Sequence, residues 1–294
     1  CLVDYPQPIM RDKIARITEE LTRTFGHRPV SHRAGRWIIN GVYASLLADA
    51  GYQVDCSITP HVAWPGAAGG KGIAADYCQC PESAYFADLA DPRRPARAQV
   101  RQADPPEPPI PPGCCSLLEV PMTILAGQRP PLARALCRAI EWCGLGRKAA
   151  NRLWPDVVWF RPLGRAGDRR RLLALLSSAE RDGRDYVMFM LHSSELMPGG
   201  SPTFATAAAI ERLYDDLECI FQSARGRFVA MTLKEYRRRF VADIAVGTGS
   251  PAPAEPTPRP ISPPMAPRTR ALTTKSARMR VVDQPTARMT ATSK

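Results

Sequence analysis

The first sixty residues alternate between patterns typical of helices and patterns typical of strands, and this order constrains the fold most strongly. After a first helix that ends at Gly26, a strand is predicted over 30–35, and Asn40 is the N-cap of a second helix that ends at Gly51. A second strand is predicted over 52–57. The order helix, strand, helix, strand indicates parallel strands with helices outside them. The first helix is predicted from one apolar stripe, formed by Met10, Ile14, Ile17, Leu21 and Phe25.

Similar patterns continue as far as about residue 243. The strands that we expect, in chain order, lie over 117–120, 157–160, 186–191 and 228–231. The expected helices lie near 132–142, from Asp168 as its cap to Gly183, and over LKEYRRRF after a capping box of Thr232 and Glu235. One more helix is predicted from an apolar stripe of Ile210, Leu213, Tyr214, Leu217, Ile220 and Phe221.

An uncharged apolar run over 186–191 ends abruptly at His192. Such a run is typical of a strand that helices cover on both faces of a parallel sheet. Ligands and catalytic groups collect at the carboxyl ends of such strands, which is where His192 is expected. Two interpretations stay open at this point: a catalytic histidine, or a hydrogen-bonded residue that caps the strand.

Two segments are rich in proline. Eight prolines over 91–113 exclude a helix or a central strand there, so we expect a surface insertion. The segment 244–294 has few large apolar residues, and we expect a disordered basic tail. The net charge of the chain is +12, and residues from 246 onward carry half of it. RNA, acidic lipid or no partner at all are open for this tail, and we predict no specific nucleic-acid ligand.

The cysteines and the hydropathy pattern indicate in which cellular compartment the protein is expected. The nine cysteines include no paired CxxC motif, and their odd number argues against a complete disulfide framework. Reduced thiols therefore indicate a cytoplasmic protein. No apolar run reaches the roughly 18 to 20 residues that a membrane helix needs, so no membrane span is expected.

Four motifs, in the same order along the chain, carry a resemblance to a known family. They are RAGRW over 33–37, GYQVDCSITP over 51–60, LEVPM over 118–122 and HSSELMPG over 192–199. Together they resemble the polysaccharide deacetylase family with the NodB-homology fold, in its WalW-like branch. The likeness runs from about Tyr5 to Phe240.

The resemblance implies a deformed (β/α) barrel and the metal-assisted removal of acetyl groups, most often from N-acetyl amino sugars. It implies His192 as the general acid and Arg33 as the arginine that orients the base. It makes Asp55 a candidate for the carboxylate that tunes the histidine, although Asp55 could equally cap the following turn. Trp37, Trp64, Leu191 and Ser193 are the residues that we expect to contact the carbohydrate.

Two motifs of that family are absent from this sequence. The family has a base and a metal ligand in an Asp-Asp motif, and two further ligands in a His-x-x-x-His motif. None of the four histidines here has that spacing, so we name no metal ligand in this chain, although the family's cofactor is a divalent metal, Zn above all. YPQP over 5–8 resembles the segment after the second motif. We therefore expect an incomplete barrel, and a non-catalytic carbohydrate-binding or interaction protein is the alternative function.

Overall fold

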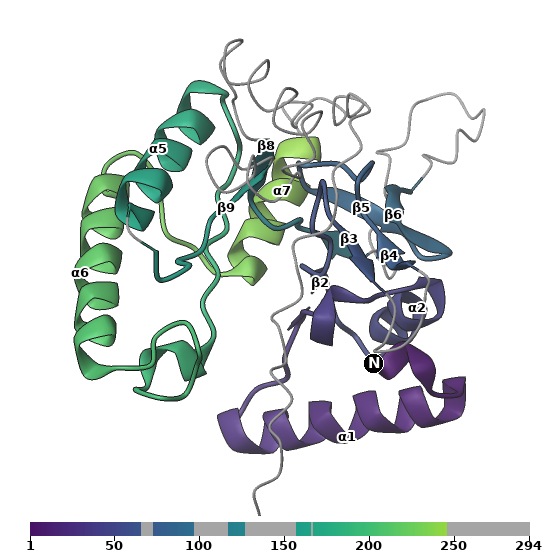
Figure 1. Cartoon of the computed structure of the whole chain (residues 1–294). Coiled ribbons are helices and arrows are strands. Elements are labelled where there is room, and N and C mark those ends of the chain that lie inside the picture. The colour runs from purple at the N-terminus through teal and green to yellow at the C-terminus, as the bar shows by residue number, and fades with distance from the viewer. Residues whose placement is uncertain (66–72, 97–116, 127–156, 166, 246–294) are drawn as a thin grey trace, which may run out of the picture. The chain divides into compact units, whose positions relative to one another are not determined.

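The computed structural model describes residues 1–65, 73–96, 117–126, 157–165 and 167–245 (Figure 1). Its helices are α1 (Gln7–Phe25), α2 (Gly41–Asp49), α5 (Asp168–Arg181), α6 (Ala207–Ala224) and α7 (Leu233–Ala245), with 3-10 turns at Leu2–Asp4, Gly35–Trp37 and Ser193–Leu196. Its strands are β1 (Ser31–His32), β2 (Val54–Asp55), β3 (Ala63–Pro65), β4 (Ile73–Asp76), β5 (Tyr85–Asp88), β6 (Asp91–Pro95), β7 (Leu118–Glu119), β8 (Ile124–Ala126) and β9 (Val157–Trp159). The chain is a mixed α/β protein, as its pattern predicts.

The main sheet has the strand order β1-β2-β7-β5-β6. The first three strands are parallel, as expected, whereas β5 and β6 are antiparallel to their neighbours. Strands β3 and β4 form a separate antiparallel pair, and so do β8 and β9. Because β1 and β6 lie at the two edges, the sheet within the described residues is open and does not close into a barrel.

Helices cover both faces of the parallel strands. On one face α1 and α2 pack over a core that includes Met10, Ile14, Leu47 and Ile58. On the other face Val54 of β2 and Leu118 of β7 pack against Tyr236 of α7. Since successive side chains of a strand point to opposite faces, the next residues of β2 and β7, Asp55 and Glu119, point toward the α1 and α2 side.

The first two helices follow the sequence pattern closely. Gly26, with a φ of 72°, ends α1, and the side chain of Asn40 accepts a hydrogen bond of 2.9 Å from the Tyr43 amide at the start of α2. The apolar stripe of α1 is only partly buried, however. Ile17 and Phe25 are 52% and 64% exposed, because the buried contacts of the helix are made by Met10, Ile14 and Thr18.

Two predicted strands are wrong. Residues 186–191 are extended but form no strand, and their amides instead bond singly to Thr123 Oγ1 and to the Phe160 carbonyl. Residues 228–231 form no strand either, since only an isolated bridge joins Phe228 to Arg225. The capping box before α7 is confirmed: Thr232 Oγ1 accepts from the Glu235 amide, and the Glu235 carboxylate accepts from the Thr232 amide at 2.7 Å.

The predicted cap of α5 is also corrected. Gly167 is the N-cap residue, and the buried Asp168 side chain accepts hydrogen bonds from the Leu163 and Arg165 amides of the preceding loop. Helices α5 and α6 lie side by side and run in the same direction, with Arg169 paired to Asp216 near one end (Figure 1). The predicted helix is α6, in which Ile210, Leu213 and Ile220 of the stripe are buried, whereas Tyr214 and Phe221 are 47% and 55% exposed.

The proline-rich segment begins with an edge strand. β6 (Asp91–Pro95) pairs only with β5, and proline is tolerated there because an edge strand needs amide donors on one side only. This agrees with the exclusion of a helix or a central strand. The rest of the predicted insertion, the helix near 132–142 and the tail from 246 onward lie outside the described residues.

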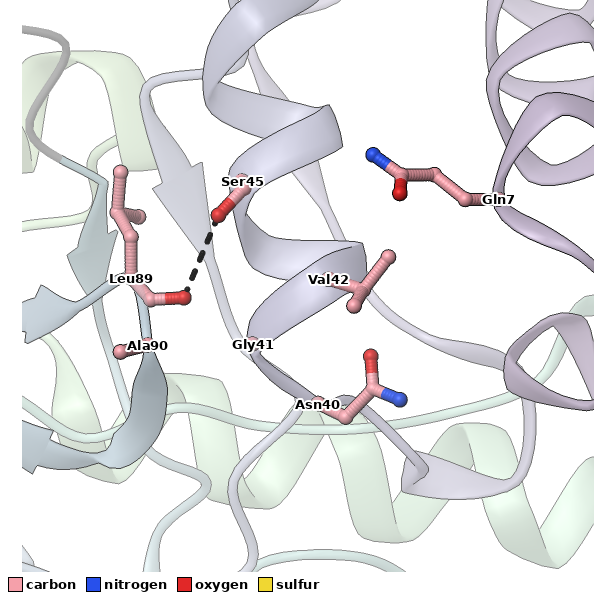
Figure 2. A pocket seen from close by; sticks show the side chains of 7 residues that line it. All are labelled: Gln7, Asn40, Gly41, Val42, Ser45, Leu89 and Ala90. Atoms are coloured by element: carbon pink, nitrogen blue, oxygen red, sulfur yellow. Dashed lines mark hydrogen bonds between the residues drawn. The ribbon is translucent and has the colours of Figure 1, made fainter.

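The start of α2 lies against the turn between β5 and β6, and we expect a side chain at Gly41 to break this contact. A Cβ atom there would overlap the Ala90 carbonyl oxygen and lie 2.8 Å from its carbonyl carbon (Figure 2). Gly41→Ala should therefore lower the free energy of unfolding by about 1–3 kcal/mol, which exceeds the higher helix propensity of alanine. Urea unfolding measures the loss. Gly35→Ala, which meets no atom within 4 Å, is the control, and equal stability of both variants would contradict the close contact.

Candidate functional site

Three polar residues form a row across the parallel strands. The register pairs His32 of β1 with Asp55 of β2, and Asp55 with Glu119 of β7. His32 Nδ1 lies 2.7 Å from Asp55 Oδ1, and His32 Nε2 lies 2.8 Å from the Tyr43 hydroxyl of α2. Asp55 and Glu119 are 0% exposed. Because α1 and α2 cover this face, the row is a buried network rather than a surface site.

The two carboxyl groups of this row cannot both be charged. Glu119 Oε2 is buried without a hydrogen-bond donor among the described residues, although Oε1 accepts 3.0 Å from the Ile58 amide. Burial, followed by the negative charge of Asp55 and a hydrogen bond with it, raises the pKa of Glu119 well above its usual range. A bond between two carboxyl groups requires a proton, so the protonated Glu119 donates to Asp55.

This carboxyl pair fixes the two loops that follow β1 and β2. Ser57 Oγ donates to Asp55 at 2.9 Å and accepts from the Ala34 amide at 2.7 Å, which connects the loop after β1 to β2. The bond from the Ile58 amide to Glu119 holds the loop after β2. Asp55 also accepts from the Ser57 amide, so it does cap the turn after β2, which was one of its two predicted roles.

These loops bring Trp37 and Trp64 together with Trp159 of β9. The ring centroids of Trp37 and Trp64 are 6.5 Å apart in a stacked arrangement, and both rings meet Trp159 edge to face at 6.0 and 6.1 Å. Trp64 Nε1 donates 2.8 Å to Thr59 Oγ1, and the Tyr77 hydroxyl donates 2.6 Å to the Trp37 carbonyl. All three rings are partly exposed, and we call them the tryptophan cluster.

Strained backbone is concentrated in the same loops. Arg36, Trp37 and His61 have φ values of 59°, 64° and 67°, and they are the non-glycine residues with positive φ among those described. Such a conformation costs about 1–2 kcal/mol for each residue that has a side chain. Strain that the surrounding contacts maintain is typical of binding and catalytic loops.

Arg33 lies next to the tryptophan cluster. Its guanidinium carbon is 5.2 Å from the centre of the Trp37 ring, and Nη2 is 3.5 Å from Met188 Sδ. The neighbouring Cys56 is a buried thiol that donates to the His32 carbonyl. Burial raises the pKa of Cys56 to about 12, so this thiol is neutral and chemically inert at physiological pH.

His192 lies at the start of the 3-10 turn Ser193–Leu196 and does not contact Asp55, which is already bonded to His32. The prediction that Asp55 tunes His192 is therefore wrong. A different carboxylate meets His192: Glu195 Oε2 accepts 2.9 Å from its amide and lies 3.4 Å from its Nδ1. Arg161 holds the other oxygen of Glu195 at 3.1 Å. The imidazole itself is 61% exposed.

The two other predicted contact residues lie apart from the tryptophan cluster in sequence and in packing. Leu191 packs against Phe204, Ile210 and Leu213, and Ser193 is exposed on the 3-10 turn. By contrast, Met190 packs with Met122 and Ile124 beneath the tryptophan cluster. Of the predicted carbohydrate-contacting residues, Trp37 and Trp64 are thus the pair that the fold brings together.

The described residues do not fit a divalent metal ion. Both ring nitrogens of His32 are hydrogen-bonded, the Asp55 oxygens are occupied by His32 and Ser57, and Glu119 is protonated. The His61 ring bonds to Glu82 at 2.6 Å, and among the described residues no group of three or more ligand-type side chains is arranged so that it could hold a metal ion. Buried groups already committed to one another are poor ligands.

Sequence reasoning missed Glu119, Tyr43 and Trp159, and it considered His32 only as a possible metal ligand. A signal for one of them exists: Glu119 is a charged residue inside the apolar strand pattern LLEV, and Asp55 occupies the same position in YQVDCS. Two acids in neighbouring buried strands indicate a shared network. The pairing of His32 with Asp55 depends on strand register, which the sequence does not specify.

A cavity of about 410 Å³ lies elsewhere, between α1, the start of α2 and the β5–β6 turn (Figure 2). Its polar side chains are used within the fold, since Asn40 caps α2 and Ser45 Oγ donates to the Leu89 carbonyl.

Within the described ranges, no helix is long and apolar enough to cross a membrane. Comparison with known proteins identified no matching family model, no similar curated protein and no similar solved structure.

The protonated state of Glu119 predicts how stability depends on pH. In the unfolded chain its pKa is near 4.5, and in the folded protein it is far higher. Between these two pKa values, wild type binds one more proton when folded than when unfolded. Its free energy of unfolding therefore falls by about 1.4 kcal/mol for each pH unit above 4.5. Glu119→Gln keeps a donor toward Asp55 without a titratable proton. Its stability relative to wild type should rise with pH by this amount, as measured by urea unfolding at several pH values.

Asp55→Asn is the matched control for that experiment. It replaces an acceptor of bonds from His32 and Ser57, so it should lower the stability at every pH. Identical pH profiles for wild type and Glu119→Gln would show that Glu119 is charged in the folded protein.

Proposed function

We propose that the chain recognises a carbohydrate through the tryptophan cluster, on an incomplete deformed (β/α) barrel of the polysaccharide deacetylase type. The observation that supports this most strongly is the association of Trp37, Trp64 and Trp159 on strained loops after parallel strands. Sugar rings present C–H faces that pack on aromatic rings, while their hydroxyls need polar partners at the rim. Arg33 and the Trp64 loop provide such a rim.

The open sheet supports the proposal of an incomplete barrel. Parallel strands β1, β2 and β7 have helices on both faces, which is the arrangement of α/β folds, and β1 lies at an edge. Ligands of such folds bind outside the carboxyl ends of the strands. The loops that hold Arg33, Trp37 and Trp64 follow the carboxyl ends of β1 and β2.

Binding of an oligosaccharide of N-acetyl amino sugars, followed by tryptophan fluorescence or calorimetry, tests this function. Trp64→Ala should weaken binding about tenfold, because a stacked ring contributes about 1.5 kcal/mol. Tyr214→Ala, which removes a 47% exposed aromatic ring from α6, should leave the affinity unchanged. EDTA should also have no effect, since the described residues do not fit a metal. Equal affinities for wild type and Trp64→Ala would contradict the proposal.

Hydrolysis of an acetyl group is the second candidate function, and the geometry of His192 favours it. Its exposed ring lies with Nδ1 toward the buried Glu195, whose position Arg161 fixes, and this leaves Nε2 on the other side of the ring. A carboxylate at one imidazole nitrogen orients the other for proton transfer. This assignment of His192 as the acid involves neither the metal nor the base of the resembled family.

Acetate release from the same oligosaccharide distinguishes the two functions. If the chain hydrolyses the substrate, His192→Gln should lower the rate at least about a hundredfold, the usual contribution of a general acid. Its affinity for the oligosaccharide should not change. The exposed His27→Gln is the matched control. If wild type and His192→Gln release acetate at the same rate, the assignment of His192 as the acid is wrong.

A further inference from the structure

Arg33 is an exposed arginine, and its surroundings differ from those of four half-buried arginines of the chain. Arg161 pairs with Glu195, Arg171 with Asp168, Arg184 with Glu82 and Arg227 with Glu180. For Arg33, no carboxylate lies within ion-pair distance among the residues that the structure describes. It contacts the ring face of Trp37, the sulfur of Met188 and the neutral thiol of Cys56, none of which carries a negative charge.

The acidic groups nearest to Arg33 do not neutralise it either. Glu119 and Cys56 both feel the positive charge of Arg33, yet burial keeps the Glu119 carboxyl protonated and the Cys56 thiol neutral. Asp55 is committed to His32, Ser57 and Glu119. A full positive charge is thus held at the tryptophan cluster by stacking rather than by an ion pair.

We infer that Arg33 binds a carboxylate on the carbohydrate, so that the ligand is an amino-sugar polymer that also contains uronic acid residues. This rests on the proposed function and defines its ligand class. A guanidinium group matches a carboxylate through two parallel hydrogen bonds, and a stacked guanidinium loses little freedom on binding. A sugar ring on the tryptophan cluster brings its ring substituents to Arg33, whose guanidinium carbon is 5.2 Å from the Trp37 ring.

The test compares two ligands that differ only in charge. One is an oligosaccharide in which N-acetylhexosamine alternates with uronic acid, and the other is the same compound with its carboxyl groups reduced to alcohols. Wild type should bind the acidic form at least about tenfold more tightly, because a hydrogen bond to a charged group contributes about 1.5–3 kcal/mol. The difference should shrink as salt is added.

Substitution of Arg33 makes the test specific. Arg33→Gln should reduce the affinity for the acidic ligand about tenfold or more and leave that for the reduced ligand within about twofold. Arg33→Lys keeps the charge but not the two parallel bonds, so its affinity should be intermediate. Arg36→Gln, in the same loop, is the matched control and should bind like wild type.

The possible outcomes separate this inference from the proposed function. Tight binding of the reduced ligand without any preference for the acidic one overturns the carboxylate site, while carbohydrate binding stands. Failure of both ligands to bind overturns both proposals. A loss of affinity for short single-stranded RNA in Arg33→Gln, with no loss for the acidic sugar, would assign the stacked cation to base recognition instead.

Discussion

The placement of two fully buried carboxyl groups, Asp55 and Glu119, side by side on neighbouring strands is the constraint on which the candidate site depends. Two fully buried acids side by side are tolerated only if one is protonated and their remaining oxygens find donors. Here those donors are His32, Ser57 and the amide of Ile58. The requirement for donors draws both loops at the carboxyl ends of β1 and β2 toward the sheet.

Loops held in this way can maintain backbone conformations that are unfavourable by themselves. Arg36, Trp37 and His61 all have positive φ, and the bonds around Ser57, Ile58 and Tyr77 keep them there. These loops carry Arg33, Trp37 and Trp64, which form the tryptophan cluster and its neighbouring cation together with Trp159. The polar network holds these loops through the Ser57 and Ile58 bonds, so it acts on the tryptophan cluster by positioning.

Much of the fold could be predicted from local patterns. The periodicity of α1, the Asn40 cap and the capping box at Thr232 each depend on a few neighbouring residues, and each is present in the structure. The strand predicted over 186–191 is absent. An uninterrupted apolar run has no period, so it does not distinguish a strand from another buried segment. The stripe of α6 is only partly buried, with Tyr214 and Phe221 exposed, because an apolar stripe does not show how wide the covering neighbour is.

The candidate site could be predicted only in part. Trp37, Trp64 and Arg33 were found through a resemblance in their motifs, but Trp159 joins them from a strand far along the chain. The predicted pairing of Asp55 with His192 was wrong because Asp55 lies beside His32 instead. That pairing is set by strand register, which is a property of the folded sheet. Glu195 meets His192 through the 3-10 turn Ser193–Leu196, which follows the predicted strand and was not itself predicted.

The central claim is that a carbohydrate binds on the tryptophan cluster. Titration of the uniformly ¹⁵N-labelled protein with the acidic oligosaccharide, observed through the indole N–H signals, tests it most directly. The account predicts that the signals of Trp37, Trp64 and Trp159, assigned by single substitutions, move together along one saturable curve. Indole signals that stay in place while the ligand binds would show that the carbohydrate site lies elsewhere.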